Sequence, residues 1–219
     1  MEVERYGTNP GLGRWDRFGR FTGSTMAPVK LVRPRVSYAD LQRTPEDGRR
    51  YELYDGEVFV VPSPIPLHQL VAHRFANLLQ AYQETRGGLV FLSPIDIVFS
   101  YVDVLQPDVV FFRGGRETLI DLRAPIRAVP DLVVEVLSPT TATVDRGRKM
   151  QMFARYGVLE YWLVDPEGET VEVYRLVGRH YALAQSASRS DSACSFVLPE
   201  FSFGVSALFE VRLKPDATY

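Results

Sequence analysis

A single glutamate, Glu135, interrupts the apolar run LVVEVL at residues 132–137. A continuous apolar run of this length is typical of a strand that is buried on both faces of a sheet. A carboxylate inside such a strand is costly unless it meets a cation, a hydrogen-bond donor or a proton. The alternative is an edge strand whose glutamate faces water. The run therefore predicts either a functional carboxylate in a buried strand or an exposed one at a sheet edge.

Two other segments have the period of helices. Apolar side chains recur every three or four residues over 66–86 and over about 145–157, and each set shares one helix face. Gly87 and Gly88 are expected to end the first helix. Ser37 is expected to cap a shorter helix at the start of the folded part.

Strand patterns account for most of the remaining chain. The Asp55-Gly56 pair predicts a hairpin over residues 50–64. Further strands are expected in the segments 88–100, 106–112, 130–138, 159–165 and 170–176, and polar residues 186–195 predict a loop before a last strand and a short helix near 204–210. This order predicts an α/β (α+β) fold with a mixed β-sheet flanked by helices.

The ends of the chain differ from its middle. Residues 1–35 are rich in Gly, Arg and Pro without a sustained apolar period, which predicts a disordered N-terminal tail. One domain is expected over 36–211, followed by a C-terminal tail at 212–219.

Composition excludes several classes of protein. The one cysteine, Cys194, allows no internal disulfide and no zinc site of cysteines, so a cytoplasmic setting is expected. No apolar stretch approaches the ~20 residues that span a bilayer, and no membrane association is expected. The net charge of −2 and pI near 6.0 do not fit a protein that coats nucleic acid by bulk charge.

Asp108 also opens an apolar strand, just after Pro107. Its alternative role is that of a turn-capping aspartate. Two carboxylates on neighbouring strands can instead converge on one divalent cation, and hard oxygen ligands suit Mg²⁺ or Mn²⁺. Asp108 and Glu135 are therefore the candidate metal ligands.

Lys149 shares a helix face with the apolar residues Met152, Phe153 and Tyr156, so it is expected to point inward. Its alternatives are a surface ion pair with Asp145 or a lysine that snorkels to water. As a catalytic group it would orient an attacking water or neutralise phosphate charge. Because a tethered charge near water adds little stability, its removal is expected to leave folding intact.

Three further side chains are weaker candidates. His68 lies on the apolar face of the first helix, where a histidine is more often a satisfied core residue than a catalyst. Glu52 and Glu57 lie in the hairpin, which either adds a carboxylate to the site or exposes them. The sequence contains no Walker-type phosphate loop and no Gly-x-Ser-x-Gly elbow.

At these residues the chain resembles the Uma-two (Uma2) family of bacterial proteins, which belongs to the PD-(D/E)xK restriction-endonuclease-like superfamily. The resemblance runs from about Tyr38 to about Phe209. It is carried by PEDGRRYELYDGEV at 45–58, PLHQ at 66–69, QPDVVF at 106–111, PDLVVEVLSPTTATVDRGRK at 130–149 and YGVLEYWLVDP at 156–166.

The resemblance implies a metal pair at Asp108 and Glu135. The superfamily's lysine usually stands two residues after the glutamate, where this chain has Leu137. The family instead offers a lysine from the following helix, which matches Lys149. The chain thus departs from the superfamily pattern at one position and follows the family pattern there.

The resemblance also implies supporting roles for Glu57 and His68, which match a hairpin glutamate and a histidine near the first helix start. It implies an endonuclease that hydrolyses phosphodiester bonds in nucleic acid with Mg²⁺ or Mn²⁺, with DNA as the favoured substrate. A catalytically inactive module that binds nucleic acid or protein, and a small-molecule hydrolase, are the alternatives. A homodimer is compatible with cleavage of both strands.

Overall fold

The computed structural model describes residues 14–15, 21–22, 35–43 and 47–210. The chain divides into two units, Met1–Pro34 and Arg35–Tyr219. In the first unit, β1 (Arg14–Trp15) pairs antiparallel with β2 (Phe21–Thr22). Outside the described residues lie the rest of the expected N-terminal tail up to residue 34, the expected C-terminal tail, and residues 44–46 after the short helix that follows Ser37.

A six-stranded mixed sheet forms the centre of the second unit, in the order β12-β11-β10-β9-β8-β5. Its central pair, β9 and β10, is parallel, and the other neighbours are antiparallel. The strands are β5 (Leu89–Leu92), β8 (Val109–Phe112), β9 (Leu132–Val136), β10 (Glu160–Asp165), β11 (Thr170–Val177) and β12 (His180–Ser188).

A smaller four-stranded sheet has the order β4-β3-β7-β6. It begins with the hairpin that the sequence predicts, in which Asp55 and Gly56 take left-handed φ angles of 51° and 80°. Its strands are β3 (Arg50–Tyr54), β4 (Glu57–Val61), β6 (Ile97–Val98) and β7 (Val104–Leu105), and a separate pair is formed by β13 (Ser192–Cys194) and β14 (Ser202–Gly204).

The long helix α2 (Pro66–Arg86) has the predicted bounds. The second predicted helix starts earlier than expected and is continuous through α3 (Ala142–Val144), the π-helical segment η2 (Asp145–Lys149) and α4 (Met150–Tyr156). Shorter helices are α1 (Tyr38–Leu41), capped by Ser37 as predicted, η1 (Glu117–Leu119) and α5 (Ser206–Phe209). Within the described residues, no helix is long and apolar enough to cross a bilayer.

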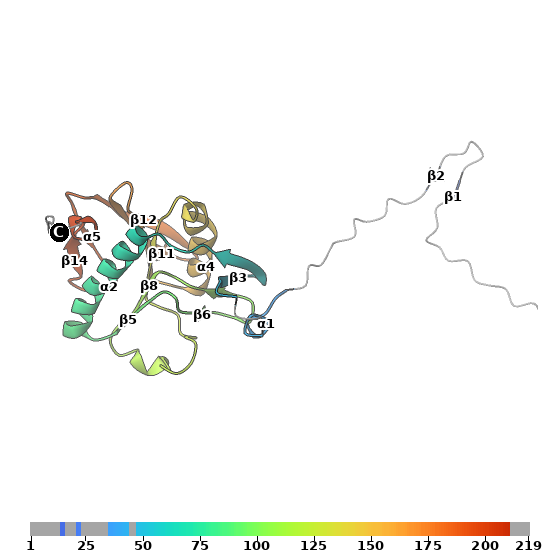
Figure 1. The fold of residues 1–219 in the computed structure, drawn as a ribbon, viewed down its shortest axis with the longest axis horizontal. Coiled ribbons are helices and arrows are strands. Elements are labelled where there is room, and N and C mark those ends of the chain that lie inside the picture. Colours follow the sequence, from blue (N-terminus) through green and yellow to red (C-terminus); the bar gives the residue numbers. More distant parts are fainter. Residues whose placement is uncertain (1–13, 16–20, 23–34, 44–46, 211–219) are drawn as a thin grey trace, which may run out of the picture. The chain divides into compact units, whose positions relative to one another are not determined.

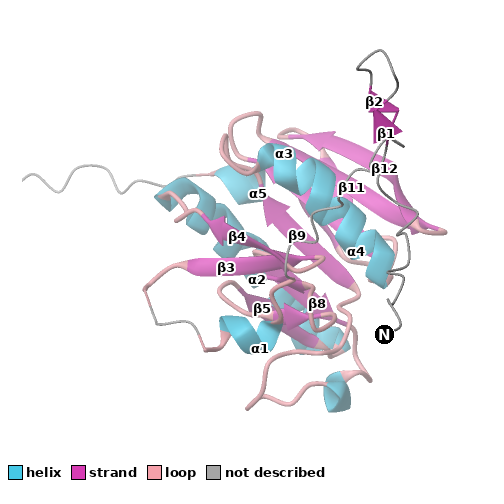
Figure 2. Ribbon diagram, turned by 90° about the vertical axis from the view of Figure 1, so that its right-hand side faces the viewer, coloured by secondary structure: helices cyan, strands magenta, loops and turns pink. Residues whose placement is uncertain are grey.

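Two apolar cores lie on opposite faces of the six-stranded sheet. On β9, Leu132, Val134 and Val136 join the core that α2 covers, whereas Val133 and Leu137 join the core that α4 covers. Figure 2 shows α4 on the near side of the sheet and α2 behind it, and Figure 1 shows α5 beside α2. Because successive side chains of a strand alternate in direction, Glu135 must point to the α4 face.

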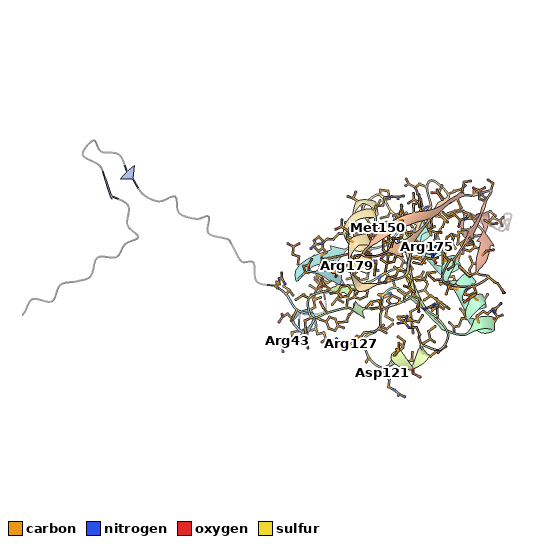
Figure 3. The ribbon with its side chains drawn as sticks, turned by 180° about the vertical axis from the view of Figure 1, so that it is seen from behind. Arg43, Asp121, Arg127, Met150, Arg175 and Arg179 are labelled. Carbon is orange, nitrogen blue, oxygen red and sulfur yellow. The ribbon has the colours of Figure 1, made fainter. Side chains whose placement is uncertain are left out.

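The polar segment 186–195 is not the loop that the sequence predicts. It contains the end of β12, a short turn and β13. β12 is an edge strand whose side chains are mostly exposed, so backbone pairing with β11 holds it without an apolar pattern. Figure 3 shows this side of the molecule. Met150 of α4 lies beside β11, the strand that contains Arg175, and Arg179 follows that strand.

Candidate active site

Strand register brings Asp108 and Glu135 together. β8 pairs antiparallel with β9, with Val109 opposite Val134. The next residues outward along the same register are Asp108 and Glu135, which therefore lie opposite each other on the α4 face. Asp108 Oδ2 accepts a hydrogen bond of 2.8 Å from the backbone N–H of Val136. Both carboxylates line one cavity of about 280 Å³.

Glu135 is 2% exposed and lies in a central strand, so the alternative of a solvated edge glutamate is wrong. Its Oε2 accepts a hydrogen bond of 3.0 Å from Lys149 Nζ, whereas the buried Oε1 has no hydrogen-bond partner. Burial raises the pKa of Glu135 well above its usual range; Lys149 opposes this rise, and Asp108 adds to it. The unpartnered oxygen therefore calls for either a proton or a cation.

Lys149 points inward, as the helical period predicts, and is 6% exposed. Its Nζ lies 3.0 Å from Glu135 Oε2, 3.3 Å from Glu52 Oε1 and 3.6 Å from Asp145 Oδ1. Burial alone lowers the pKa of Lys149, but these three carboxylates outweigh burial and raise it well above its usual range. The ion pair with Asp145 is thus present, but inside the core and not on the surface.

The π-helical segment η2 carries two buried charged residues of the site. Asp145 and Lys149 are its first and last residues, and residues four apart share one helix face. A π turn widens the helix and shifts the side chains relative to an α-helix, and such turns occur often at functional sites. Burial raises the pKa of Asp145, and Lys149 opposes that rise. The groups that favour the charged form of this carboxylate are the ammonium of Lys149 and the side chain of Thr141.

The hairpin carboxylate of the site is Glu52, and the prediction of Glu57 is wrong in its placement. Glu52 is 3% exposed; its Oε1 accepts from the backbone N–H of Gln106 at 2.8 Å and its Oε2 from the hydroxyl of Tyr54 at 2.6 Å. Glu57 opens the edge strand β4 and is exposed, where it pairs with Arg148 at 2.9 Å. Because Glu52 lies between apolar residues in mid-strand, that local pattern could have identified it.

His68 comes from the first turn of α2 and is 8% exposed. Its Nε2 lies 3.1 Å from Asp108 Oδ2. The buried Nδ1 has no hydrogen-bond partner. A polar side chain in contact with a ligating carboxylate constrains the orientation of that carboxylate, so His68 can orient Asp108.

The cluster fits a hard cation held by two protein carboxylates. Among the described residues, no three His, Cys, Asp or Glu side chains converge in a geometry that could hold a metal ion. Mg²⁺ does not need a third, because it is usually bound by one or two carboxylates and keeps several waters. The unpartnered Glu135 Oε1, with Asp108 in the same cavity, supplies the oxygen chemistry that such an ion requires.

Three comparisons with known proteins agree with this architecture. Residues 37–206 match the model of the Uma2 family, described as "Putative restriction endonuclease". The uncharacterized protein slr1290 of Synechocystis sp. is 26% identical over 155 residues, which cover 69% of this chain and 77% of that protein.

The chain is also similar in fold to a solved structure, described as that of "a putative nuclease belonging to DUF820" from Anabaena variabilis. It has a TM-score of 0.65 at 19% identity and covers 80% of this chain and 97% of its own. At that identity, the likeness shows the fold alone, a mixed sheet flanked by helices in a restriction-endonuclease-like core, as the sequence predicts.

Proposed function

The chain belongs to the Uma2 family, and from that premise we propose that it is a nuclease that hydrolyses phosphodiester bonds in nucleic acid with Mg²⁺ or Mn²⁺. The proposal rests on Glu135 Oε1, a buried carboxylate oxygen without a hydrogen-bond partner, in the same cavity as Asp108. A bound divalent cation polarises the phosphate and lowers the pKa of a water molecule. DNA is the favoured substrate.

Each neighbouring side chain has a role in holding this pair of ligands. His68, whose Nε2 lies 3.1 Å from Asp108 Oδ2, orients that carboxylate. Lys149 donates to Glu135 and supplies the positive charge that allows several carboxylates to be ionised side by side. Glu52 and Asp145 in turn hold the ammonium of Lys149. We therefore assign to Glu52 the supporting role that was expected of Glu57.

The hydrolysis itself needs few groups. A water oxygen forms the new bond to phosphorus, and the bond from phosphorus to the leaving sugar oxygen breaks. The water loses one proton to solvent, and the sugar oxygen gains one from solvent. The positive charge of Lys149 makes the electrostatic potential of the cavity less negative, so that a phosphate diester can approach Asp108 and Glu135.

A catalytically inactive binding module is the second candidate. It is favoured by the arrangement around Lys149, because three carboxylates face the ammonium and neutralise its charge without a substrate. In that case the cluster is an internal ion network and the cavity binds without cutting.

The test is cleavage of labelled DNA and RNA with Mg²⁺, with Mn²⁺ and with EDTA. Glu135→Gln removes the charge at nearly constant shape, and Glu57→Gln is the matched control because its carboxylate is exposed and outside the cavity. The expected result is metal-dependent cleavage by the wild type and Glu57→Gln, and its loss in Glu135→Gln. Absence of cleavage by the wild type, together with absence of Mn²⁺ binding in electron paramagnetic resonance, would overturn the proposal.

A further inference from the structure

The lining of the catalytic cavity carries little positive charge. Lys149 is already surrounded by carboxylates, and the guanidinium of Arg50 donates to Ser93 Oγ at 2.9 Å and to the carbonyl of Pro62 at 2.8 Å. The charged side chains of the lining are Asp108, Glu135, Asp145 and Glu167 against Arg50 and Lys149. When all are ionised, the four acids exceed the two bases by two negative charges, which one divalent cation would neutralise. The cavity therefore suits one phosphate and not a run of phosphates.

A protein that grips duplex DNA along its backbone neutralises several phosphates, commonly about 6–10. The cavity lining lacks the free cations for that task. Its volume of about 280 Å³ is also just under the roughly 300 Å³ at which clefts begin to enclose drug-sized ligands. A single nucleotide fits such a space, whereas a base pair does not.

An apolar wall adds a surface for an unpaired base. The end of β4 and the segment between β4 and α2 contribute Val61, Pro62, Pro64 and Ile65 to the lining. Ile65 is 57% exposed although it lines the same cavity as the candidate catalytic carboxylates. These side chains carry no hydrogen-bond donor or acceptor, so they can contact the apolar face of any base without selecting one. Within a duplex those faces are covered by neighbouring bases, so only an unstacked base can use the wall.

We propose that the cavity takes one unpaired nucleotide, so that single-stranded nucleic acid, including unpaired flaps on a duplex, is the substrate. The base contacts the wall formed with Ile65, and its phosphate faces Asp108 and Glu135. This inference rests on the proposed function, since it assigns the substrate class of the same site.

The first experiment compares cleavage of four substrates of one sequence with Mn²⁺: single-stranded DNA, single-stranded RNA, blunt duplex DNA, and duplex DNA with an unpaired flap. The expected result is cleavage of one or both single strands, and cuts in the flap, at least ~10-fold faster than cleavage of the blunt duplex, since unstacking is the main cost of presenting a base. Equal or faster cleavage of the blunt duplex would overturn the inference and leave the proposed function standing.

A binding measurement tests the same preference for single strands over duplex DNA without catalysis. Fluorescence anisotropy of the labelled substrates with the full chain and Mn²⁺ is expected to show tighter binding of a single strand than of the blunt duplex. If no substrate is cut and no Mn²⁺ is bound, the proposed function fails, and the binding measurement still decides the substrate class. Tighter duplex binding would overturn the inference.

A pair of variants tests the wall. Ile65→Ser is expected to raise KM for single strands about 3- to 10-fold, the loss for about one to two uncovered methylenes. Leu67→Ser is the control, because Leu67 is 38% exposed, two residues away, and outside the cavity lining. Melting temperatures identify any folding defect. Equal KM values for Ile65→Ser and Leu67→Ser would remove the wall from substrate binding.

Discussion

Replacing Lys149 with methionine removes the ammonium that faces three buried carboxylates and keeps most of the side-chain volume. Glu52, Glu135 and Asp145 are each 2–3% exposed, and their oxygens lie 3.0 to 3.6 Å from Nζ. Removal of one partner of a buried ion pair typically destabilises a protein by about 3–5 kcal/mol. The expectation from sequence, that removal of Lys149 leaves folding intact, does not hold for a lysine so enclosed.

The size of the loss should depend on pH. Burial raises the folded-state pKa of Glu135 and Asp145, and loss of the opposing Lys149 charge raises both further. A carboxyl group whose folded pKa is raised contributes stability that is fully present below its unfolded pKa, about 4, and is lost as pH rises through the folded pKa. Lys149 itself stays protonated across this range, because its own pKa is raised well above 10.5. The variant should therefore approach the wild type in acid and fall furthest below it near neutrality.

The assay is urea unfolding at about pH 5 and about pH 8, in which the change in midpoint at constant slope reports stability. Arg155→Met is the control, because Arg155 lies on the same helix and pairs with Asp55 at the surface, each side chain being 47% exposed. Such a pair contributes about 0–1 kcal/mol. A loss in Lys149→Met that is as small as in the control, or equal at both pH values, would refute the reasoning.

Three further predictions concern the proposed metal site. Apparent Mn²⁺ affinity should rise with pH through the raised pKa of Glu135, since the cation displaces its proton; affinity that is flat from acid to neutral pH in electron paramagnetic resonance would contradict this. His68→Asn should weaken Mn²⁺ binding about 10–100-fold in calorimetric titration by freeing Asp108, and unchanged affinity would leave His68 a core residue. Lys149→Arg should lower single-turnover cleavage about 10²-fold, because a planar guanidinium does not match the carboxylate cage; wild-type rates would remove the ammonium from the mechanism.

The convergence of Asp108 and Glu135 could be predicted because it follows from local rules. Each residue interrupts an apolar strand, and a strand alternates its side chains with a period of two. The two strands are also neighbours in the sheet, as consecutive strands often are. The register of the two strands, in which Val109 of β8 pairs with Val134 of β9, could not be predicted from the sequence.

The surroundings of Lys149 could not be predicted in the same way. Its contact with Glu52 joins residues that are far apart in the chain, and no local period reports such a contact. The π-helical turn at Asp145–Lys149 likewise changes the helix, and the one glycine inside it, Gly147, does not by itself indicate a π turn. Family resemblance pointed to Glu57, but that residue opens the edge strand β4 beside the turn and is exposed, whereas Glu52 lies in mid-strand on β3 and is buried.

The cluster is an electrostatic liability that the rest of the fold must offset. Glu135, Glu52 and Asp145 face one ammonium and Asp108 acts on Glu135, so the group carries excess negative charge when all four are ionised. Buried unbalanced charge opposes folding, and residues at functional sites often sacrifice stability in this way. The sheet can tolerate it because β9 is otherwise wholly apolar and buried, with a core on each face. A divalent cation between two of these carboxylates would relieve the repulsion that burial creates, which is why the most unfavourable side chain of the core is also its best candidate for function.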